Sequence, residues 1–359
     1  MNSIGLFLKV THKCNLQCKY CYENDQHVKK KDINIDYIYK LIDKCAKYYN
    51  EISILYHGGE PLTKGYDFYA NIYKYCKTNY PEKIFKFSIQ SNAILLDNDY
   101  YEKLKNLDIN VGISYDGLTN HIYRCDSGKT LESIKKMNNI KHIGVITVAN
   151  TDYLNNIIEE YEHIKSLGIT SLSINWMFGN TVKNDYTDLY IDKMKELFNY
   201  WMTDKDAIHI DKFSTILNMI FNNKQNIDVC RECHKRWIGM DVDGYLGMCD
   251  FGLLPKEENF GNINYIEDIN DVLFCEKRIN ILKSISNRRE LCIKKQCVLL
   301  GKCDGGCNSM IYKLNNSFYG LYEDHCNIWT SLYKYIGKTL KHTELDSLNS
   351  EITNNILNL

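Results

Sequence analysis

Three cysteines near the N-terminus form the residue group that is most clearly suited to chemistry. Cys14, Cys18 and Cys21 are spaced as C-x3-C-x2-C within one short segment. Three thiolates in one tight loop can bind three irons of a [4Fe-4S] cluster and leave the fourth iron without a protein ligand. Catalysis needs such an open metal position, as catalytic zinc sites illustrate. The alternatives are a zinc knuckle or a four-cysteine electron-transfer cluster, but zinc sites usually pair C-x2-C units and no second pair lies nearby.

The C-terminal part of the chain holds most of the other cysteines. Residues 230 to 326 contain nine of the fifteen cysteines. In a small secreted protein this would indicate disulfides, but the chain is long, has an odd cysteine count and shows no export signal. Clustered thiols in a reducing compartment more often bind metal, so we expect a small domain organised by metal. Four cysteines are interpreted as structural, because free cysteine packs as a small apolar residue: Cys45, Cys76, Cys125 and Cys275.

The elements that must position the first cysteines lie between residue 5 and about residue 178. Strand-like patterns alternate there with helical ones, such as the amphipathic stretch at 33–49. Six such units imply parallel strands with right-handed crossovers, and hence an α/β fold, a partial (β/α)6 barrel of the TIM type. The expected strands are Gly5–Val10, Ile52–Tyr56, Phe85–Gln90, Asn110–Ser114, His142–Ala149 and Ser171–Asn175.

Unusual residues follow these strands at their C-terminal ends, where barrel enzymes place their chemistry. The first strand leads into the loop of Cys14, and the second leads into the sequence HGGEP at 57–61. Ser91-Asn92 follow the third strand, and the sequence SYDG at 114–117 ends the fourth. The repeated coincidence predicts one site at this end of the barrel.

Composition and charge narrow the function classes. The chain has 44 basic and 45 acidic residues, a formal net charge of −1, and neither half is strongly basic. We therefore expect no nucleic-acid partner. No long uninterrupted apolar run occurs, so we expect no membrane partner. The N-terminal residues are typical of a first strand and not of a signal peptide, which predicts a cytoplasmic protein.

These patterns divide the chain into four expected regions. The barrel is expected over 1–185 and a helical bridge over 186–229. The small cysteine-rich iron–sulfur domain should occupy 230–335, where the pattern breaks into short segments. A C-terminal helix and polar tail are expected over 336–359.

The first cysteine group resembles that of the radical S-adenosylmethionine (SAM) superfamily. In that family, the amino and carboxylate groups of SAM bind the open iron, and an electron from the cluster cleaves SAM to a 5′-deoxyadenosyl radical that abstracts a substrate hydrogen. By this resemblance Cys14, Cys18 and Cys21 hold the SAM cluster, and an external donor such as flavodoxin or ferredoxin supplies the electron. Tyr20 matches the family's aromatic residue that contacts adenine.

The segment after the second strand resembles the family's GGEP motif. Gly58 and Gly59 would let the backbone approach a ligand closely. Glu60 would accept a hydrogen bond from the ammonium of SAM. The alternative for such a segment alone is an ordinary tight turn.

Five further residues are candidates for SAM contacts. Ser91 and Asn92 lie in QSNA where the family has QTNG, so the hydroxyl and amide are kept but the conformational freedom of glycine is lost. Ser114 and Arg124 match residues that reach the SAM carboxylate or ribose, although a surface ion pair is the alternative for Arg124. Met177 would pack on adenine, unless it is an ordinary core residue.

The C-terminal cysteines resemble those of the SPASM domain, which in radical SAM enzymes acting on peptides and proteins holds two auxiliary [4Fe-4S] clusters. The resemblance therefore implies three clusters in all; a structural zinc site is the alternative. The first auxiliary cluster would be bound by Cys230, Cys233, Cys249 and Cys307. The second would be bound by Cys292, Cys297, Cys303 and Cys326.

The reaction expected from this resemblance is modification of a peptide or protein side chain. Crosslinking or thioether formation in a peptide is our first hypothesis. The second is the reaction of anaerobic sulfatase-maturing enzymes, which oxidise Cys or Ser to formylglycine and resemble this chain around Cys249. By that resemblance Asp250 would be the base that deprotonates the substrate, although a loop-capping role is the alternative. A hypothesis from another class is a non-catalytic iron–sulfur electron carrier.

Overall fold

The computed structural model describes residues 3–21, 23, 30–137, 142–177, 185–221, 233–249, 258–303 and 305–342. One sheet runs through these residues in the order β7-β6-β5-β4-β3-β2-β1-β8-β9. All neighbouring strands are parallel except the antiparallel pair β8 and β9. The strands of the predicted barrel are β1 (Ser3–Thr11), β2 (Glu51–Gly58), β3 (Ile84–Ser91), β4 (Ile109–Ser114), β5 (Gly144–Ala149) and β6 (Ser171–Trp176). The α/β fold is confirmed, and each predicted strand end lies within two residues of the observed one.

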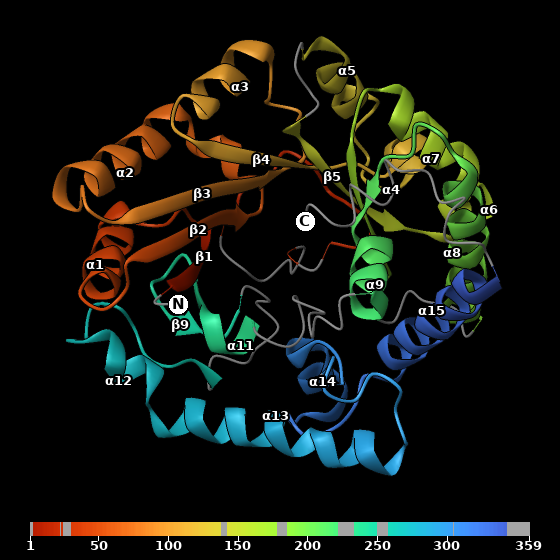
Figure 1. Cartoon of the computed structure of the whole chain (residues 1–359). Helices are drawn as coiled ribbons and strands as arrows, with labels where there is room; N and C mark the ends of the chain where they lie inside the picture. The colour runs from red at the N-terminus through yellow and green to blue at the C-terminus, as the bar shows by residue number, and fades with distance from the viewer. Residues whose placement is uncertain are drawn as a thin grey trace.

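The helices between these strands cover the outer face of the sheet, so the strands line the inside of a curved wall (Figure 1). This follows from the amphipathic patterns: α1, for example, turns Ile38, Leu41 and Ile42 into the core and begins after Asn34, whose side chain accepts from the Asp36 amide. The helices that follow these strands are α1 (Ile35–Ala46), α2 (Tyr66–Asn79), α3 (Asn98–Lys105), α4 (Asn120–Tyr123), α5 (Lys129–Lys136), α6 (Thr151–Asn155), α7 (Ile157–Ser166) and α8 (Tyr186–Thr203).

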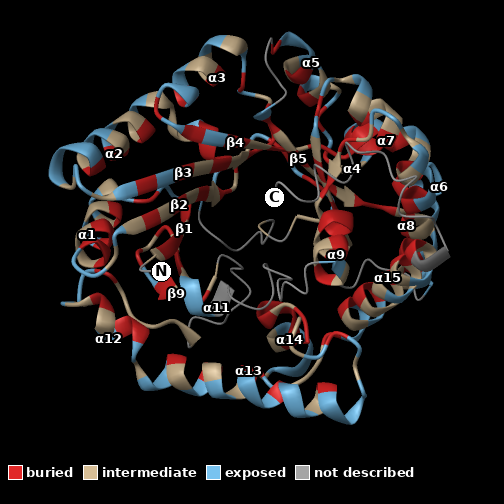
Figure 2. Ribbon diagram, viewed as in Figure 1, coloured by how far each residue is buried: buried red, intermediate tan, exposed pale blue. Residues whose placement is uncertain are grey.

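The two faces of the sheet differ in burial, as the alternating colours of the strands in Figure 2 indicate. In β2, the side chains of Ile52, Ile54 and Tyr56 point to the helices and are completely buried. The alternate residues of β2 are only partly buried, and β4, β5 and β6 alternate in the same way. Because successive residues of a strand point to opposite faces, the inner face is the more open one.

The C-terminal part closes the ring that the barrel leaves open (Figure 1). Strand β8 (Trp237–Met240) pairs with β1, and Gly5 is required there because a Cβ would lie 2.4 Å from the Trp237 ring. Helix α15 packs against α8 and α9. No described helix is long and apolar enough to cross a membrane. The remaining elements are β7 (His209–Ile210), α9 (Asp211–Phe221), α11 (Cys233–Arg236), β9 (Leu246–Gly247), α12 (Ile269–Leu273), α13 (Glu276–Lys294), α14 (Asn308–Asn315) and α15 (Glu323–His342).

The expected helical bridge differs in one respect from the structure. Between α8 and α9, residues His209–Ile210 form β7, which extends the sheet beside β6. A strand of two residues is too short to produce a periodic pattern in the sequence, which explains why only helix was predicted there.

Candidate functional site

The loop that carries Cys14, Cys18 and Cys21 begins where β1 ends. Backbone hydrogen bonds hold it against the end of β2, from the Gly59 amide to the Thr11 carbonyl at 2.7 Å and from the Glu60 amide to the Lys13 carbonyl at 2.7 Å. The strand order explains this contact, because β1 and β2 are parallel neighbours whose C-terminal ends meet at one edge. The sheet thus fixes the cysteine loop beside the GGEP segment.

The three thiols of this loop share one partly buried environment. Cys18 is buried, whereas Cys14 and Cys21 are partly exposed, and none of the three is in a disulfide. Burial raises the pKa of Cys18 to about 12, the Arg124 charge opposes this rise, and the neighbouring Cys21 and Cys14 add to it. Burial likewise raises the pKa of Cys14. Thiols that affect one another electrostatically are close in space, so the structure brings the three predicted ligands together.

The described side chains do not form a site for a single metal ion. Among the described residues, no three Cys, His, Asp or Glu side chains are arranged around one metal ion. A [4Fe-4S] cluster distributes its thiolates over several iron atoms, so its ligands do not converge on one point. Three cysteines in one loop, one of them buried and none in a disulfide, have the chemistry that such a cluster requires.

Glu60 is a buried carboxylate with neutral hydrogen-bond donors. Its Oε1 accepts from the Leu62 amide and the Ser91 hydroxyl, both at 2.9 Å, and its Oε2 accepts from the Asn92 amide at 2.8 Å. The side chain is 1% exposed, and burial raises its pKa to about 7. A carboxylate oxygen can accept two hydrogen bonds, so Oε2 can take one more donor beyond the described contacts. A ligand ammonium would suit this oxygen.

Gly58 and Gly59 permit close packing of two backbone segments. A Cβ on Gly59 would lie 2.2 Å from the Lys13 carbonyl oxygen, and one on Gly58 would lie 2.3 Å from the Thr11 carbonyl oxygen. Gly58 also has a φ of 137°, which favours glycine. Within the described residues, the backbone of these two glycines therefore closely approaches the cysteine loop itself.

Asn92 connects the third strand to the same loop. Its Nδ2 donates to Asn15 Oδ1 at 2.7 Å and lies 3.9 Å from Cys14 Sγ. The next residue, Ala93, has a φ of 63°, a left-handed backbone conformation that glycine adopts more easily than alanine. The alanine therefore occupies a conformation that would favour the glycine of the family's motif.

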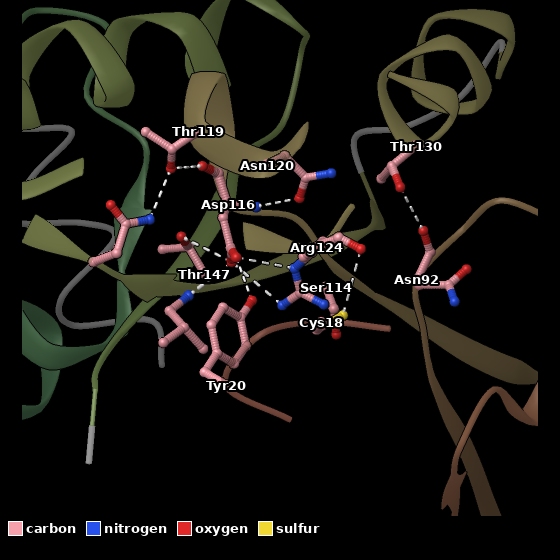
Figure 3. Close-up of polar contacts among 12 residues, drawn as sticks. Cys18, Tyr20, Asn92, Ser114, Asp116, Thr119, Asn120, Arg124, Thr130 and Thr147 are labelled. Atoms are coloured by element: carbon pink, nitrogen blue, oxygen red, sulfur yellow. Dashed lines mark hydrogen bonds and ion pairs between the residues drawn. The ribbon is translucent and has the colours of Figure 1, made fainter. Parts of the chain in front are cut away.

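Asp116 is the centre of the polar contacts beyond β4, as Figure 3 shows. Its fully buried carboxylate pairs with the Arg124 guanidinium, at 3.1 Å from Nε to Oδ2, and accepts from the Val148 amide of β5 at 2.9 Å. The Tyr20 hydroxyl donates to Oδ2 as well. Asp116 thus joins the cysteine loop, β5 and the end of α4. Sequence reasoning placed this residue in a motif but gave it no role; its position directly after a barrel strand was the available signal.

The structure therefore shows protein partners for several residues expected to contact SAM. Arg124 is 7% exposed and paired with Asp116, so it is not the surface ion pair considered as the alternative. The Tyr20 ring lies 5.6 Å from the Arg124 guanidinium. The Ser114 hydroxyl accepts from the Gln90 side-chain amide at 2.9 Å. Met177 follows β6, and its backbone amide donates to the Tyr186 hydroxyl at 2.7 Å.

The second auxiliary set of cysteines is also brought together. Burial raises the pKa of Cys326 to about 12, and the nearby Cys303, Cys292 and Cys297 add to the rise. The Cys297 amide donates to the Cys292 carbonyl at 3.0 Å, so the longer spacing between these two closes into a turn. All four residues predicted for one cluster thus share one neighbourhood. His325, which the sequence did not suggest, lies with Nε2 3.4 Å from Cys303 Sγ.

The first auxiliary set is described only in part. Cys249 Sγ lies 2.9 Å from the Ser309 hydroxyl, and Ser309 is in the first turn of α14, two residues beyond Cys307. Cys249 and Cys307 therefore approach the same helix end. Cys230 and Asp250 lie outside the described residues, as does the side chain of Cys233.

The cysteines interpreted as structural occupy different environments. Cys45 and Cys76 are completely buried in the core between helices and sheet. Cys275 begins α13, where its sulfur accepts from the Arg278 amide. Cys125 is exposed and has a φ of 57°.

Comparison with known proteins gives a family match for the N-terminal part of the chain. Residues 8–168 match the family model described as the Radical SAM superfamily. An uncharacterised protein of Methanocaldococcus jannaschii is 36% identical over 176 residues, covering 47% of this chain and 60% of that protein, which is less than two thirds of its length. The radical SAM cyclopropyl synthase TigE of Paramaledivibacter caminithermalis is 28% identical, covering 91% of this chain and 72% of TigE. A cysteine-type anaerobic sulfatase-maturating enzyme of Clostridium novyi is 25% identical, covering 86% of this chain and 88% of that enzyme.

Solved structures share the fold over most of the chain. The structure of anSMEcpe with bound AdoMet has a TM-score of 0.80 and 21% identity, and the match covers 95% of this chain and 98% of that one. SuiB of Streptococcus suis, bound to precursor peptide SuiA, has a TM-score of 0.61 and 20% identity, with 89% and 74% covered. Residues 8–168 therefore match a radical SAM domain, and over most of its length the chain is similar to a radical SAM cyclopropyl synthase and to an anaerobic sulfatase-maturating enzyme.

Proposed function

We propose that this enzyme uses a SAM-binding [4Fe-4S] cluster held by Cys14, Cys18 and Cys21 to modify a side chain of a peptide or protein. The observation that carries the proposal is the position of these three thiols, in one loop and beside the buried carboxylate of Glu60. When bound, the cluster and SAM supply a radical that removes a hydrogen atom from the substrate.

The residues around the thiols bind and orient the cofactor in this proposal. Glu60 Oε2 accepts from the ammonium of SAM, whose positive charge compensates the buried carboxylate. Ser91 and Asn92 hold the Glu60 carboxylate in place, and Asn92 also contacts the cysteine loop. Asp116 and Arg124 fix Tyr20 and hence the part of the loop between Cys18 and Cys21.

The remaining SAM contacts are proposed for the inner face. Gly58 and Gly59 shape the loop, Ser114 offers its hydroxyl inside the wall, and Met177 lies at the end of β6, where an adenine ring would meet it. Arg124 orders Tyr20 through its ion pair with Asp116, which engages Nε and Nη2 of the guanidinium. We propose that its further N–H donors contact the SAM carboxylate or ribose, as the resemblance implies.

The C-terminal cysteines are proposed to bind two auxiliary [4Fe-4S] clusters, which gives three clusters per chain. Support for the second set is the common neighbourhood of its four thiols. For the first set, the support is that Cys249 and Cys307 approach one end of α14. An external donor such as flavodoxin or ferredoxin would reduce the SAM cluster. Because the described cysteines form no disulfide, which suits a reducing compartment, we place the protein in the cytoplasm.

A peptide substrate is supported by the relatives. TigE is named a cyclopropyl synthase, and SuiB is described with a precursor peptide. We therefore propose crosslinking or thioether formation in a peptide as the first candidate reaction. Formylglycine formation is the second candidate, because the match to the sulfatase-maturating enzyme covers most of both chains. Asp250 would be the base in that reaction.

Mass spectrometry distinguishes these reactions. Reconstituted enzyme, SAM and dithionite would be incubated anaerobically with cysteine-containing peptides, taken either from sulfatase sites or from precursor peptides encoded beside this protein. A crosslink or thioether is expected to remove hydrogen and keep sulfur, whereas formylglycine formation from cysteine replaces sulfur by oxygen. If SAM is cleaved but no peptide of either kind is altered, the proposed substrate class is wrong.

A further inference from the structure

Helix α13 carries a completely buried cation near the auxiliary cysteines. Arg288 is 0% exposed, whereas its neighbours Arg289 and Glu290 are exposed. Removing a guanidinium from water costs several kcal/mol, which must be offset by hydrogen bonds and negative charge nearby. The groups around Arg288 therefore indicate which negative charge its guanidinium stabilises.

Arg288 lies next to a member of each auxiliary cysteine set. Its Nη2 donates to the side-chain oxygen of Asn308, the first residue of α14, and Cys307 directly precedes this residue. Cys292 is four residues further along α13 and is also buried. Residues four apart share one face of a helix, so Arg288 and Cys292 point to the same side of α13. Arg288 therefore contacts the residue that follows Cys307 of the first set and lies about one helical turn from Cys292 of the second.

We propose that Arg288 is a positioning residue whose buried charge is shared by the two auxiliary clusters and makes both easier to reduce. A [4Fe-4S] cluster with thiolate ligands is negatively charged, and reduction adds another negative charge. A nearby buried cation stabilises the reduced form more than the oxidised form, because the attraction grows with the charge of the cluster. This inference rests on the proposed function, since it needs both auxiliary clusters.

The test is a redox titration of the reconstituted full-length enzyme, followed by electron paramagnetic resonance. The wild type is first analysed for iron, because a total near four atoms per chain instead of about 12 would refute the auxiliary clusters themselves, and not the role of Arg288. Arg288→Gln removes the buried charge, Arg288→Lys keeps it, and Arg289→Gln removes the same charge from the adjacent exposed position.

With normal iron content, Arg288→Gln is expected to disfavour one-electron reduction of both auxiliary clusters at least tenfold, which corresponds to about 59 mV for a one-electron couple. Arg288→Lys and Arg289→Gln should stay close to the wild type, and the SAM cluster should be unchanged in all variants. Unchanged auxiliary potentials in Arg288→Gln would overturn the proposal.

The variant with glutamine could instead lose iron. In that case the proposal expects a selective loss of the auxiliary clusters, with the SAM cluster retained and Arg288→Lys restoring the iron. If Arg288→Lys loses the same iron as Arg288→Gln, the shape of arginine and not its charge is what the domain requires, and the proposal is wrong.

Discussion

Replacing Asp116 by asparagine is expected to destabilise the enzyme strongly, because it leaves the Arg124 guanidinium buried without its negative partner. Asp116 is 0% and Arg124 7% exposed, and the ion pair has an Nε–Oδ2 distance of 3.1 Å. Removal of one partner of a buried ion pair typically costs about 3–5 kcal/mol. The asparagine side chain would keep the volume of the aspartate, so the loss would report the charge and not a cavity.

The free energy of unfolding can be measured by urea denaturation of anaerobically prepared protein, followed by tryptophan fluorescence. Asp152→Asn is the matched control, because Asp152 is an exposed carboxylate that accepts from Tyr123, the residue directly before Arg124. We expect a change within about 0.5 kcal/mol for this control. A second arm adds Arg124→Gln: the double variant should lose less than the sum of the single variants, by about 0.5–3 kcal/mol. A loss below about 1 kcal/mol for Asp116→Asn, or simple additivity, would refute the reasoning, since a buried pair is expected to couple.

Three further outcomes are expected. Burial raises the pKa of Glu60 from 4.5 to about 7, so Glu60 of the folded protein keeps its proton at pH values where the unfolded chain has lost it. Its contribution to stability, on the order of 3 kcal/mol, should therefore be lost as the pH rises from about 4.5 to 7. Glu60→Gln should flatten this part of the plot of unfolding free energy against pH, while Glu132→Gln, at an exposed position, should not. Gly59→Ala should lower the free energy of unfolding by about 1–3 kcal/mol and release iron from the cysteine loop, because its Cβ would meet the Lys13 carbonyl. Gly247→Ala, at a position with open space, should do neither, and equal behaviour of the two variants would contradict the packing argument. Cys326→Ala should lower the iron content by about four atoms per chain and Cys76→Ala should leave it unchanged, as metal analysis can show; no loss from Cys326→Ala would remove it from the ligand set.

The strands of the barrel were predictable because their sequences reflect their surroundings directly. Central parallel strands such as 52–56 read as apolar or alternating runs, and the loops after them contain cysteine and glycine that few other structures need. The meeting of the cysteine loop with the GGEP segment followed from strand order alone. β7 was not predictable, because its two residues carry no period, and β8 was not, because its partner β1 lies more than 200 residues away.

The interaction partners of side chains were harder to predict than the positions of residues in the fold. Arg124 and Tyr20 were expected near SAM, but the sequence could not show that Asp116 engages both. Such an ion pair depends on how α4 packs over the loop of β1, and no local pattern records that packing. The same holds for Arg288 and His325, which are distant in sequence from several of the cysteines they approach.

Reductive cleavage of SAM tests the central claim most directly. The reconstituted wild type, supplied with dithionite and SAM, is expected to release 5′-deoxyadenosine and methionine, measured by liquid chromatography with mass spectrometry. The Cys45→Ala variant should do the same, since Cys45 lies in the core and away from the loop. The Cys18→Ala variant should release neither product, because the cluster that binds SAM would lack one of its three ligands. Wild-type protein that holds its iron but does not cleave SAM, or cleavage that persists in Cys18→Ala, would contradict this account.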